Sequence, residues 1–228
     1  MSTFNDITEI AGTYSILLPL FVGFFKFRFK YFAYYYVFLF WLTCSGIANI
    51  LTVAFASDGN STILIFHIYT MLEFLLLLLL YYKMGHSEGI QKATIFCMVA
   101  FCMFKVVDIF FITGLNQIDT LAIIVESIVM IAFSFLFFAQ LINERVPSLA
   151  VFPPFWINSG VLIYFSSSFF IFLFSTYILQ DTKQYYVYWS IHNILIVVRD
   201  ILFTIAMIAL GKLEANGTYR ENPLAIHS

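Results

Sequence analysis

Seven long apolar runs divide the chain, and short polar segments separate them. A helix needs about 20 mostly apolar residues to cross the hydrocarbon core of a bilayer, and each run has about that length. Pro153 and Pro154 should open the sixth helix, and Pro19 should kink the first. The pattern predicts spanning helices at approximately 9–25, 33–55, 62–82, 93–113, 120–142, 155–178 and 187–210.

The segments between the runs are too short to hold a further domain. We therefore predict an all-α fold: a polytopic membrane protein whose residues 1–210 form one seven-transmembrane-helix bundle. Residues 211–228 are polar, and we expect a disordered tail there. The chain is 62% hydrophobic and 11% charged, whereas soluble domains are roughly a quarter charged. The expected solvent of its outer surface is thus the lipid bilayer.

Lysine and arginine are distributed asymmetrically among the polar segments. Eight of them lie in alternate loops and the C-terminal tail: Lys26, Arg28, Lys30, Lys83, Lys92, Arg145, Lys212 and Arg220. The opposite loops and the N-terminal segment hold only Lys183. Because cytoplasmic loops are enriched in these residues, we expect the N-terminus outside and the C-terminus in the cytoplasm. The setting that we predict is a bacterial inner (plasma) membrane.

Other classes fit the sequence less well. A net charge of −2 and the lack of a basic, aromatic-rich polar segment argue against nucleic-acid binding. The seventh run has no internal lysine, as a microbial rhodopsin would need, and no Asn-Pro turn of the G-protein-coupled receptor kind. It also lacks the paired histidines, one turn apart, of seven-helix zinc amidohydrolases. No Pro-Gln motif of the sugar transporters occurs either, so these motifs point to no family.

Polar and ionisable side chains interrupt the predicted helices. Such groups are costly in a membrane, so they usually face the bundle interior, pair with one another and mark function. The candidate ligand- or proton-binding residues are His67, Tyr69, Glu73, Lys105, Asp108, Glu126, His192, Asn193, Arg199 and Asp200. Two asparagines, Asn49 and Asn158, also fall within the runs.

Helical spacing groups several of these candidates. His192 and Arg199 are seven residues apart and share one face of the seventh helix, while Asn193 and Asp200 repeat that spacing on the adjacent stripe. This continuous polar stripe is typical of a helix that faces an interior cavity. Lys105 and Asp108 are placed to pair within the fourth helix, and Tyr69 and Glu73 lie one turn apart.

Depth along the helices suggests a pocket. Glu73 and Arg199 fall near the midplane, and the other charged candidates and both histidines fall in the outer half or beside Arg199. We therefore expect a polar pocket open to the outside, with its floor near Glu73 and Arg199. Four carboxyl groups face only two cations there. Either the excess carboxyls are protonated, since burial disfavours their charge, or a cation fills the gap.

Structural roles compete with these functional ones. Arg199 can bridge Glu73 or Asp200 and simply fix helix packing, and Lys105–Asp108 can be a structural pair. His67, His192, Asp108 and Glu126 have the residue types of a zinc site, but no spacing motif joins them, so we predict no metal and no cofactor. The serine tract Ser166–Ser168 favours close helix packing over a nucleophile.

Four functions remain open from the sequence. The first is a receptor or sensor that binds a small ligand or a proton and passes the signal to a cytoplasmic or membrane protein partner. The second is a small secondary transporter, proton-coupled through Glu73 or Glu126, with Asn158 and the serine tract continuing the path inward. The third is an intramembrane metal-dependent hydrolase, and the fourth is a scaffold subunit. An apolar inner half favours the receptor.

Overall fold

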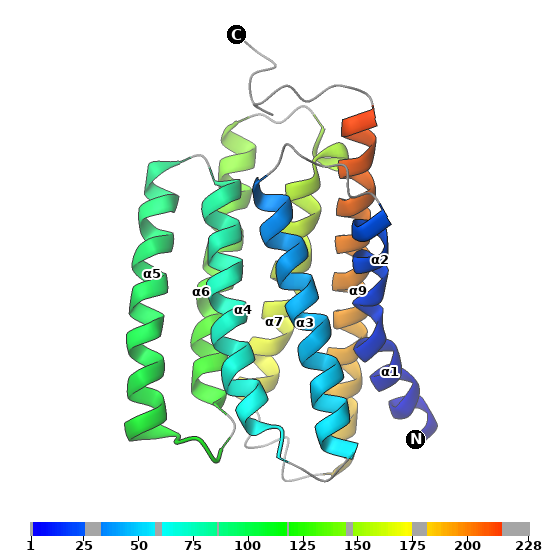
Figure 1. Ribbon diagram of the computed structural model, residues 1–228, viewed down its shortest axis with the longest axis vertical. Helices are drawn as coiled ribbons and strands as arrows, with labels where there is room; N and C mark the ends of the chain where they lie inside the picture. The colour runs from blue at the N-terminus through cyan, green and yellow to red at the C-terminus, as the bar shows by residue number, and fades with distance from the viewer. Residues whose placement is uncertain are drawn as a thin grey trace.

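The structure is a bundle of helices. This computed structural model describes residues 2–25, 33–57, 61–85, 87–117, 119–144, 148–174 and 182–215, with no β-strand among them. Two short elements, the π-helix η1 (Asp108–Ile112) and the 3-10 helix η2 (Leu149–Val151), accompany the α-helices. Those α-helices are α1 (Ser2–Ser15), α2 (Leu17–Phe25), α3 (Ala33–Ser57), α4 (Ile63–Met84), α5 (Glu88–Val107), α6 (Thr120–Asn143), α7 (Pro153–Leu173) and α9 (Thr182–Ala215) (Figure 1).

Seven helical segments in the described part of the chain are long and apolar enough to cross a membrane, as predicted. Several helices extend beyond the apolar runs. α5 begins at Glu88, where an ion pair between Glu88 and Lys92 one turn later suits a helix end in water. α9 continues to Ala215, so the first residues of the predicted tail are helical. Residues 175–178 of the predicted sixth helix, and 216–228 of the tail, lie outside the described residues.

Proline divides the first spanning segment, as predicted. α1 ends at Ser15 and α2 begins at Leu17, with a turn at Ile16 between them. Pro19 has no N–H to donate to the carbonyl of Ser15 four residues earlier, so the helical ladder is interrupted at that point. The sixth helix likewise begins with Pro153 and Pro154, where missing N–H groups cost little.

The helices alternate in direction, and α9 occupies a central place in their packing. α9 contacts α1, α2 and α7, while α6 packs against α7, and α4 packs against α3, α5 and α6. α1 begins at one end of the bundle and α9 ends at the other (Figure 1). The described part of the chain therefore crosses the bundle an odd number of times, so that α1 begins on one side and α9 ends on the other (Figure 1). Which of these sides is cytoplasmic stays a prediction.

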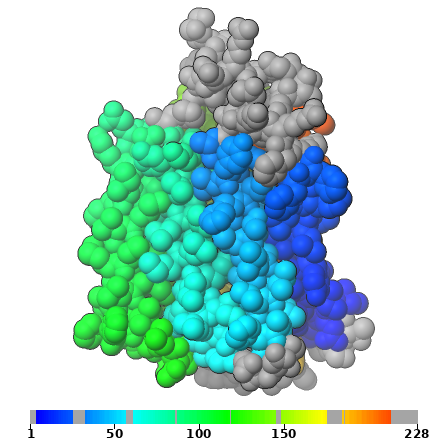
Figure 2. Space-filling view, viewed as in Figure 1, coloured from blue at the N-terminus to red at the C-terminus, as the bar shows by residue number. Residues whose placement is uncertain are grey.

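Apolar side chains cover the outside of the bundle and polar ones lie within. α5 stands at one edge, beside α4 (Figure 2). Phe96, Phe110 and Phe111 of this edge are 73%, 75% and 83% exposed. The charged residues Lys105 and Asp108 of the same edge are 2% and 0% exposed. This arrangement reverses that of a soluble protein and fits lipid as the surrounding solvent.

α7 and α9 approach each other closely at Gly160. A Cβ atom built on Gly160 would lie 2.5 Å from a ring carbon of Phe203. That ring cannot easily retreat, because it packs edge-to-face against Phe38 and Trp41, with ring centroids 5.1 and 5.4 Å away. Small residues permit such close backbone contact between membrane helices, so Gly160 sets the distance between α7 and α9.

We expect Gly160→Ala to destabilise the protein by about 1–3 kcal/mol, the usual cost of overpacking a tight core. The measurement is the melting temperature of the purified protein in detergent. Gly89→Ala is the matched control, because Gly89 is exposed in the first turn of α5 and its Cβ would contact only the Ser87 hydroxyl at 3.5 Å. Equal melting temperatures for both variants would contradict this account of the α7–α9 contact.

Candidate functional site

An arginine in the middle of α9 lies at the centre of the bundle. Arg199 is 3% exposed, and its Nε donates to Oδ1 of Asp200 at 2.8 Å. Three aromatic rings surround the guanidinium group, whose carbon lies 4.5 Å from the centroid of Tyr164, 5.7 Å from that of Phe203 and 5.9 Å from that of Trp41. Aromatic faces attract a guanidinium cation. The sequence suggested Glu73 or Asp200 as the partner that Arg199 bridges, and Asp200 is the one in contact.

Asp200 connects this arginine to the N-terminal helix. Its carboxylate is fully buried, and the hydroxyl of Ser15 lies 2.5 Å from Oδ2. Ser15 is the last residue of α1, next to the break that Pro19 produces. The carboxylate thus receives one donor from α9 itself and one from α1, which makes it a link between the two helices.

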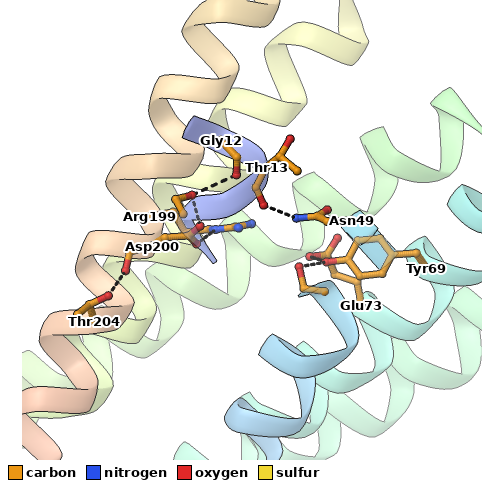
Figure 3. A network of polar contacts seen from close by, with 10 residues as sticks. Gly12, Thr13, Asn49, Tyr69, Glu73, Arg199, Asp200 and Thr204 are labelled. Atoms are coloured by element: carbon orange, nitrogen blue, oxygen red, sulfur yellow. Dashed lines mark hydrogen bonds and ion pairs between the residues drawn. The ribbon is translucent and has the colours of Figure 1, made fainter. Parts of the chain in front are cut away.

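A second polar group lies across the bundle from Arg199, on α3 and α4. The hydroxyl of Tyr69 lies 2.8 Å from Oε1 of Glu73 and 2.9 Å from the hydroxyl of Ser45. Figure 3 shows Tyr69 and Glu73 on the same side of α4, as their one-turn spacing predicted. Glu73 is 4% exposed. Its electrostatic neighbours are Arg199 and, through the approaching indole N–H, Trp41.

Glu126 of α6 connects this group to charged residues nearer the start of α6. Its charged neighbours are Glu73, Asp119 and Lys105. It is 2% exposed, and its Oε1 has no hydrogen-bond partner among the described residues. Two of the three neighbours carry the same sign of charge, so this carboxyl has a poorer environment than the other acids of the site.

Lys105, predicted to pair with Asp108 one turn away, instead forms its ion pair with Asp119. Asp119 immediately precedes α6, so the pair joins the C-terminal end of α5 to the start of the next helix. His67 of α4 completes the cluster, with Nδ1 3.4 Å from both Lys105 Nζ and Asp119 Oδ2. Its Nε2 faces the carbonyl of Gln117 at 3.0 Å and therefore carries a proton. Asp119 was not among the predicted residues, because it lies in the polar segment just before the run predicted at 120–142.

Asp108 has a different partner from the predicted one. The hydroxyl of Thr113 donates to its Oδ1 at 2.7 Å, and the backbone N–H of Thr113 donates to its carbonyl at 2.8 Å. The backbone forms the π-helix η1 over these residues, and π-turns often occur at functional sites. Thr113 thus takes the place that helical spacing assigned to Lys105.

The polar stripe predicted on the last helix divides between two neighbouring helices. His192 is 5% exposed, and its Nδ1 lies 3.1 Å from the hydroxyl of Ser167 on α7. Asn193 instead packs against α1, where its side chain would lie 3.2 Å from a Cβ built on Gly12. The stripe therefore faces packed helices on both sides, and its two charged members are fully or almost fully buried.

The possible zinc ligands do not come together. His67 contacts Lys105 and Asp119, whereas His192 contacts Ser167. Among the described residues, no group of three or more histidine, cysteine, aspartate or glutamate side chains is placed to hold a metal ion. The four predicted ligands lie on four helices, and packing has given each of them a different neighbour.

Toward the opposite end of the bundle, one neutral polar group is buried. Tyr81 of α4 donates to Oδ1 of Asn158 at 2.6 Å, and its hydroxyl lies 2.8 Å from that of Ser134. The amide of Asn158 donates to the carbonyl of Ser134 at 3.0 Å. All three residues are fully buried, and they join α4, α6 and α7. This trio is self-contained, since it uses its own donors and acceptors.

Several residues of the site carried only weak signals in the sequence. Ser15 lies four residues before Pro19, which leaves its carbonyl without a helical donor. Asp119 stands directly before an apolar run, a usual position for a helix-capping residue. Trp41 and Tyr164 had no signal, because aromatic residues are common throughout the runs. Ser167 belongs to the tract for which close helix packing was expected, and its hydroxyl contacts His192 of the adjacent α9.

Comparison with models of protein families, with curated proteins and with solved structures found no match to this chain. The buried charged groups of the described residues are carboxyls, one guanidinium enclosed by aromatic rings, and one lysine. They lie on α4, α5, η1, α6 and α9, with Asp119 just before α6.

We expect Arg199→Met to lower stability by about 3–5 kcal/mol, because it leaves the buried Asp200 carboxylate without its cation. The double variant Arg199→Met/Asp200→Asn should lose less than the sum of the two single variants, since no charge is then left unpaired. Thermal unfolding of all four proteins in detergent gives the coupling energy. An unchanged or raised melting temperature for Arg199→Met would mean that Asp200 does not satisfy this arginine.

A second double-mutant cycle distinguishes the two possible partners of Lys105. Lys105→Met and Asp119→Asn should be coupled by about 0.5–3 kcal/mol, as residues in direct contact are. The matched control combines Lys105→Met with Asp108→Asn, which replaces an acid on the same segment of chain and should give additive losses. Coupling with Asp108 and additivity with Asp119, measured by unfolding temperature, would restore the pairing that helical spacing suggests.

Proposed function

We propose that this chain is an integral-membrane receptor or sensor that binds a small ligand or a proton among its buried polar groups. In this proposal the N-terminal end of the bundle faces outward from a bacterial inner membrane. The distribution of lysine and arginine supports that orientation. The signal would pass through helix movement to a protein partner at the cytoplasmic end, since the loops are too short to form an output domain of their own.

One observation carries the proposal: polar and apolar residues are separated along the same helices. In α4 the order is His67 and Glu73, then the fully buried Leu77. In α9 it is Arg199 and Asp200, then a buried apolar segment. α4 and α9 both run from the proposed outer end to the inner end (Figure 1). The charged groups therefore occupy the outer and central levels.

The inner level is an apolar layer. It contains buried side chains of four helices: Leu77, Leu80, Met84, Phe133, Phe137, Leu141, Phe203, Met207 and Leu210 from α4, α6 and α9, with Tyr35 and Phe38 from α3. Apart from the trio of Tyr81, Ser134 and Asn158, the buried side chains of this layer offer few polar groups to hydrate a permeating solute. A protein that senses on one side and transmits by helix movement needs no such path, which favours a receptor.

A secondary transporter is the second candidate, and the trio of Tyr81, Ser134 and Asn158 favours it. These groups lie within the apolar layer and continue polar character toward the inner end. A transporter must open that level to the inside during its cycle. The two candidates therefore differ in whether the inner layer ever becomes accessible to water.

Thiol labelling tests this difference without a known ligand. In a background with Cys44, Cys97 and Cys102 replaced by alanine, we would place single cysteines at Leu77 or Phe137 in reconstituted vesicles. A membrane-impermeant maleimide is then applied at the C-terminal end of the protein. Lys212→Cys is the reference, because Lys212 is exposed at that end of α9 and also reports the orientation of the protein.

A receptor predicts rapid labelling of Lys212→Cys and none of the buried positions over hours. Progressive labelling at Leu77 and Phe137 in folded protein would show an inward-open state, and would replace the receptor with the transporter. Labelling of Lys212→Cys only from the opposite side would reverse the proposed orientation.

A further inference from the structure

The acids of the described interior differ in what neutralises them. Asp119 is paired with Lys105, and Asp200 is paired with Arg199. Asp108 accepts the hydroxyl of Thr113 within its own segment. Three carboxyl groups, Asp108, Glu73 and Glu126, thus have no cation in contact in the part of the chain that the structure describes. Glu73 and Glu126 form a pair, because they are electrostatic neighbours of each other.

Glu73 is the better partnered member of this pair. Tyr69 donates a hydrogen bond to its Oε1 at 2.8 Å, and Arg199 is a cation among its electrostatic neighbours. The indole N–H of Trp41 faces it as well and has no hydrogen-bond partner within bonding distance in the described interior. Burial disfavours a charge on this carboxyl, and the donors and the positive charge oppose that effect.

Glu126 has the opposite surroundings. No described side chain donates a hydrogen bond to its Oε1. The groups that face it are Glu73 from α4, Asp119 before its own helix, Lys105 from α5 and the phenol of Tyr164 from α7. The ammonium group of Lys105 is already paired with Asp119. An ionised Glu126 would thus be a buried anion beside two others, with its charge unmatched.

From this geometry we infer that Glu126 is a proton-binding site, and that Glu73 is the fixed anion beside it. The inference rests on the proposed function, since it names the proton as what the polar interior senses. A metal ion needs several ligands, and among the described residues no group of three or more histidine, cysteine, aspartate or glutamate side chains is placed to hold one. A proton needs only the one carboxyl.

Release of the proton would act on the helix packing. It would place a second anion next to Glu73, on a helix that contacts both α4 and α7. Repulsion between two adjacent buried carboxylates favours separation of their helices or entry of water. α6 would then move relative to α4, and this movement would reach the inner end, where Phe133 and Tyr81 of the same two helices are in ring contact at 5.7 Å.

Infrared difference spectroscopy on the purified full-length protein tests the site directly, because a protonated buried carboxyl has its own carbonyl band. Spectra would be recorded from about pH 5 to about pH 9, which extends to both sides of the ordinary pKa of histidine. Wild type should show a protonated-carboxyl band that decreases as the pH rises. Glu126→Gln should lack this band, whereas the matched variant Glu73→Gln should keep one. A band that survives Glu126→Gln unchanged would overturn the assignment.

Trp41 reports the structural consequence. With Trp156 and Trp189 replaced by phenylalanine, its fluorescence should change with pH, and this change should disappear in Glu126→Gln. The change should persist in His67→Gln and His192→Gln, which remove the neighbouring histidines. A change that is lost in a histidine variant, or that follows sodium against choline at constant pH, would contradict a proton on Glu126.

Two controls keep the outcomes separable. If Glu126→Gln does not fold, Glu126→Asp keeps a carboxyl on a shorter side chain and should shift the infrared band, and an unshifted band would overturn the site. The thiol-labelling result is independent of this experiment. A proton on Glu126 with an accessible inner layer would keep the site and reject the receptor, and the reverse combination would reject only the site.

Discussion

The architecture depends on one constraint: a charged side chain at membrane depth must be enclosed and partnered by protein. Arg199 and Asp200 are consecutive on α9, and consecutive residues of a helix point about 100° apart. One helix therefore needs neighbours on two faces. Ser15 of α1 meets the aspartate, and Tyr164 of α7 with Trp41 of α3 encloses the arginine. This requirement explains why α9 is surrounded by helices that are distant in sequence.

The same constraint explains how the helix at the edge is held. α5 buries few side chains, and most of its large apolar residues face outward. Association between apolar helix faces gains little in lipid, because the tails are as apolar as the side chains. The ion pair of Lys105 with Asp119, next to His67 of α4, provides the specific contact that lipid-facing residues lack. Charge at depth thus serves assembly as well as chemistry.

The buried polar groups differ in how many of their hydrogen-bond donors and acceptors are paired. The Asp200 carboxylate and the Tyr81 trio have donors and acceptors in balance, which is typical of groups that fix helix positions. Oxygen atoms of Glu126, Asp108 and Asp119 have no hydrogen-bond partner among the described residues, and of these three acids Glu126 has neither a cation nor a hydroxyl in contact. Because Glu126 neighbours both Glu73 and Asp119, it joins the polar group of Tyr69 and Glu73 to the cluster of Lys105, Asp119 and His67. A change of charge there would reach most helices of the bundle.

The number of spanning helices, their approximate limits and the break at Pro19 could be predicted from the sequence, because they follow from hydrophobic length and from backbone chemistry local to each run. Most of the buried charges could be identified in the same way, since such groups stand out against apolar neighbours. Their partners could not. Helical spacing suggested Asp108 as the partner of Lys105, yet Lys105 pairs with Asp119 from the start of the next helix, and Asp108 accepts the Thr113 hydroxyl. Partner choice depends on how helices rotate and pack against each other, and a one-dimensional pattern carries little of that information.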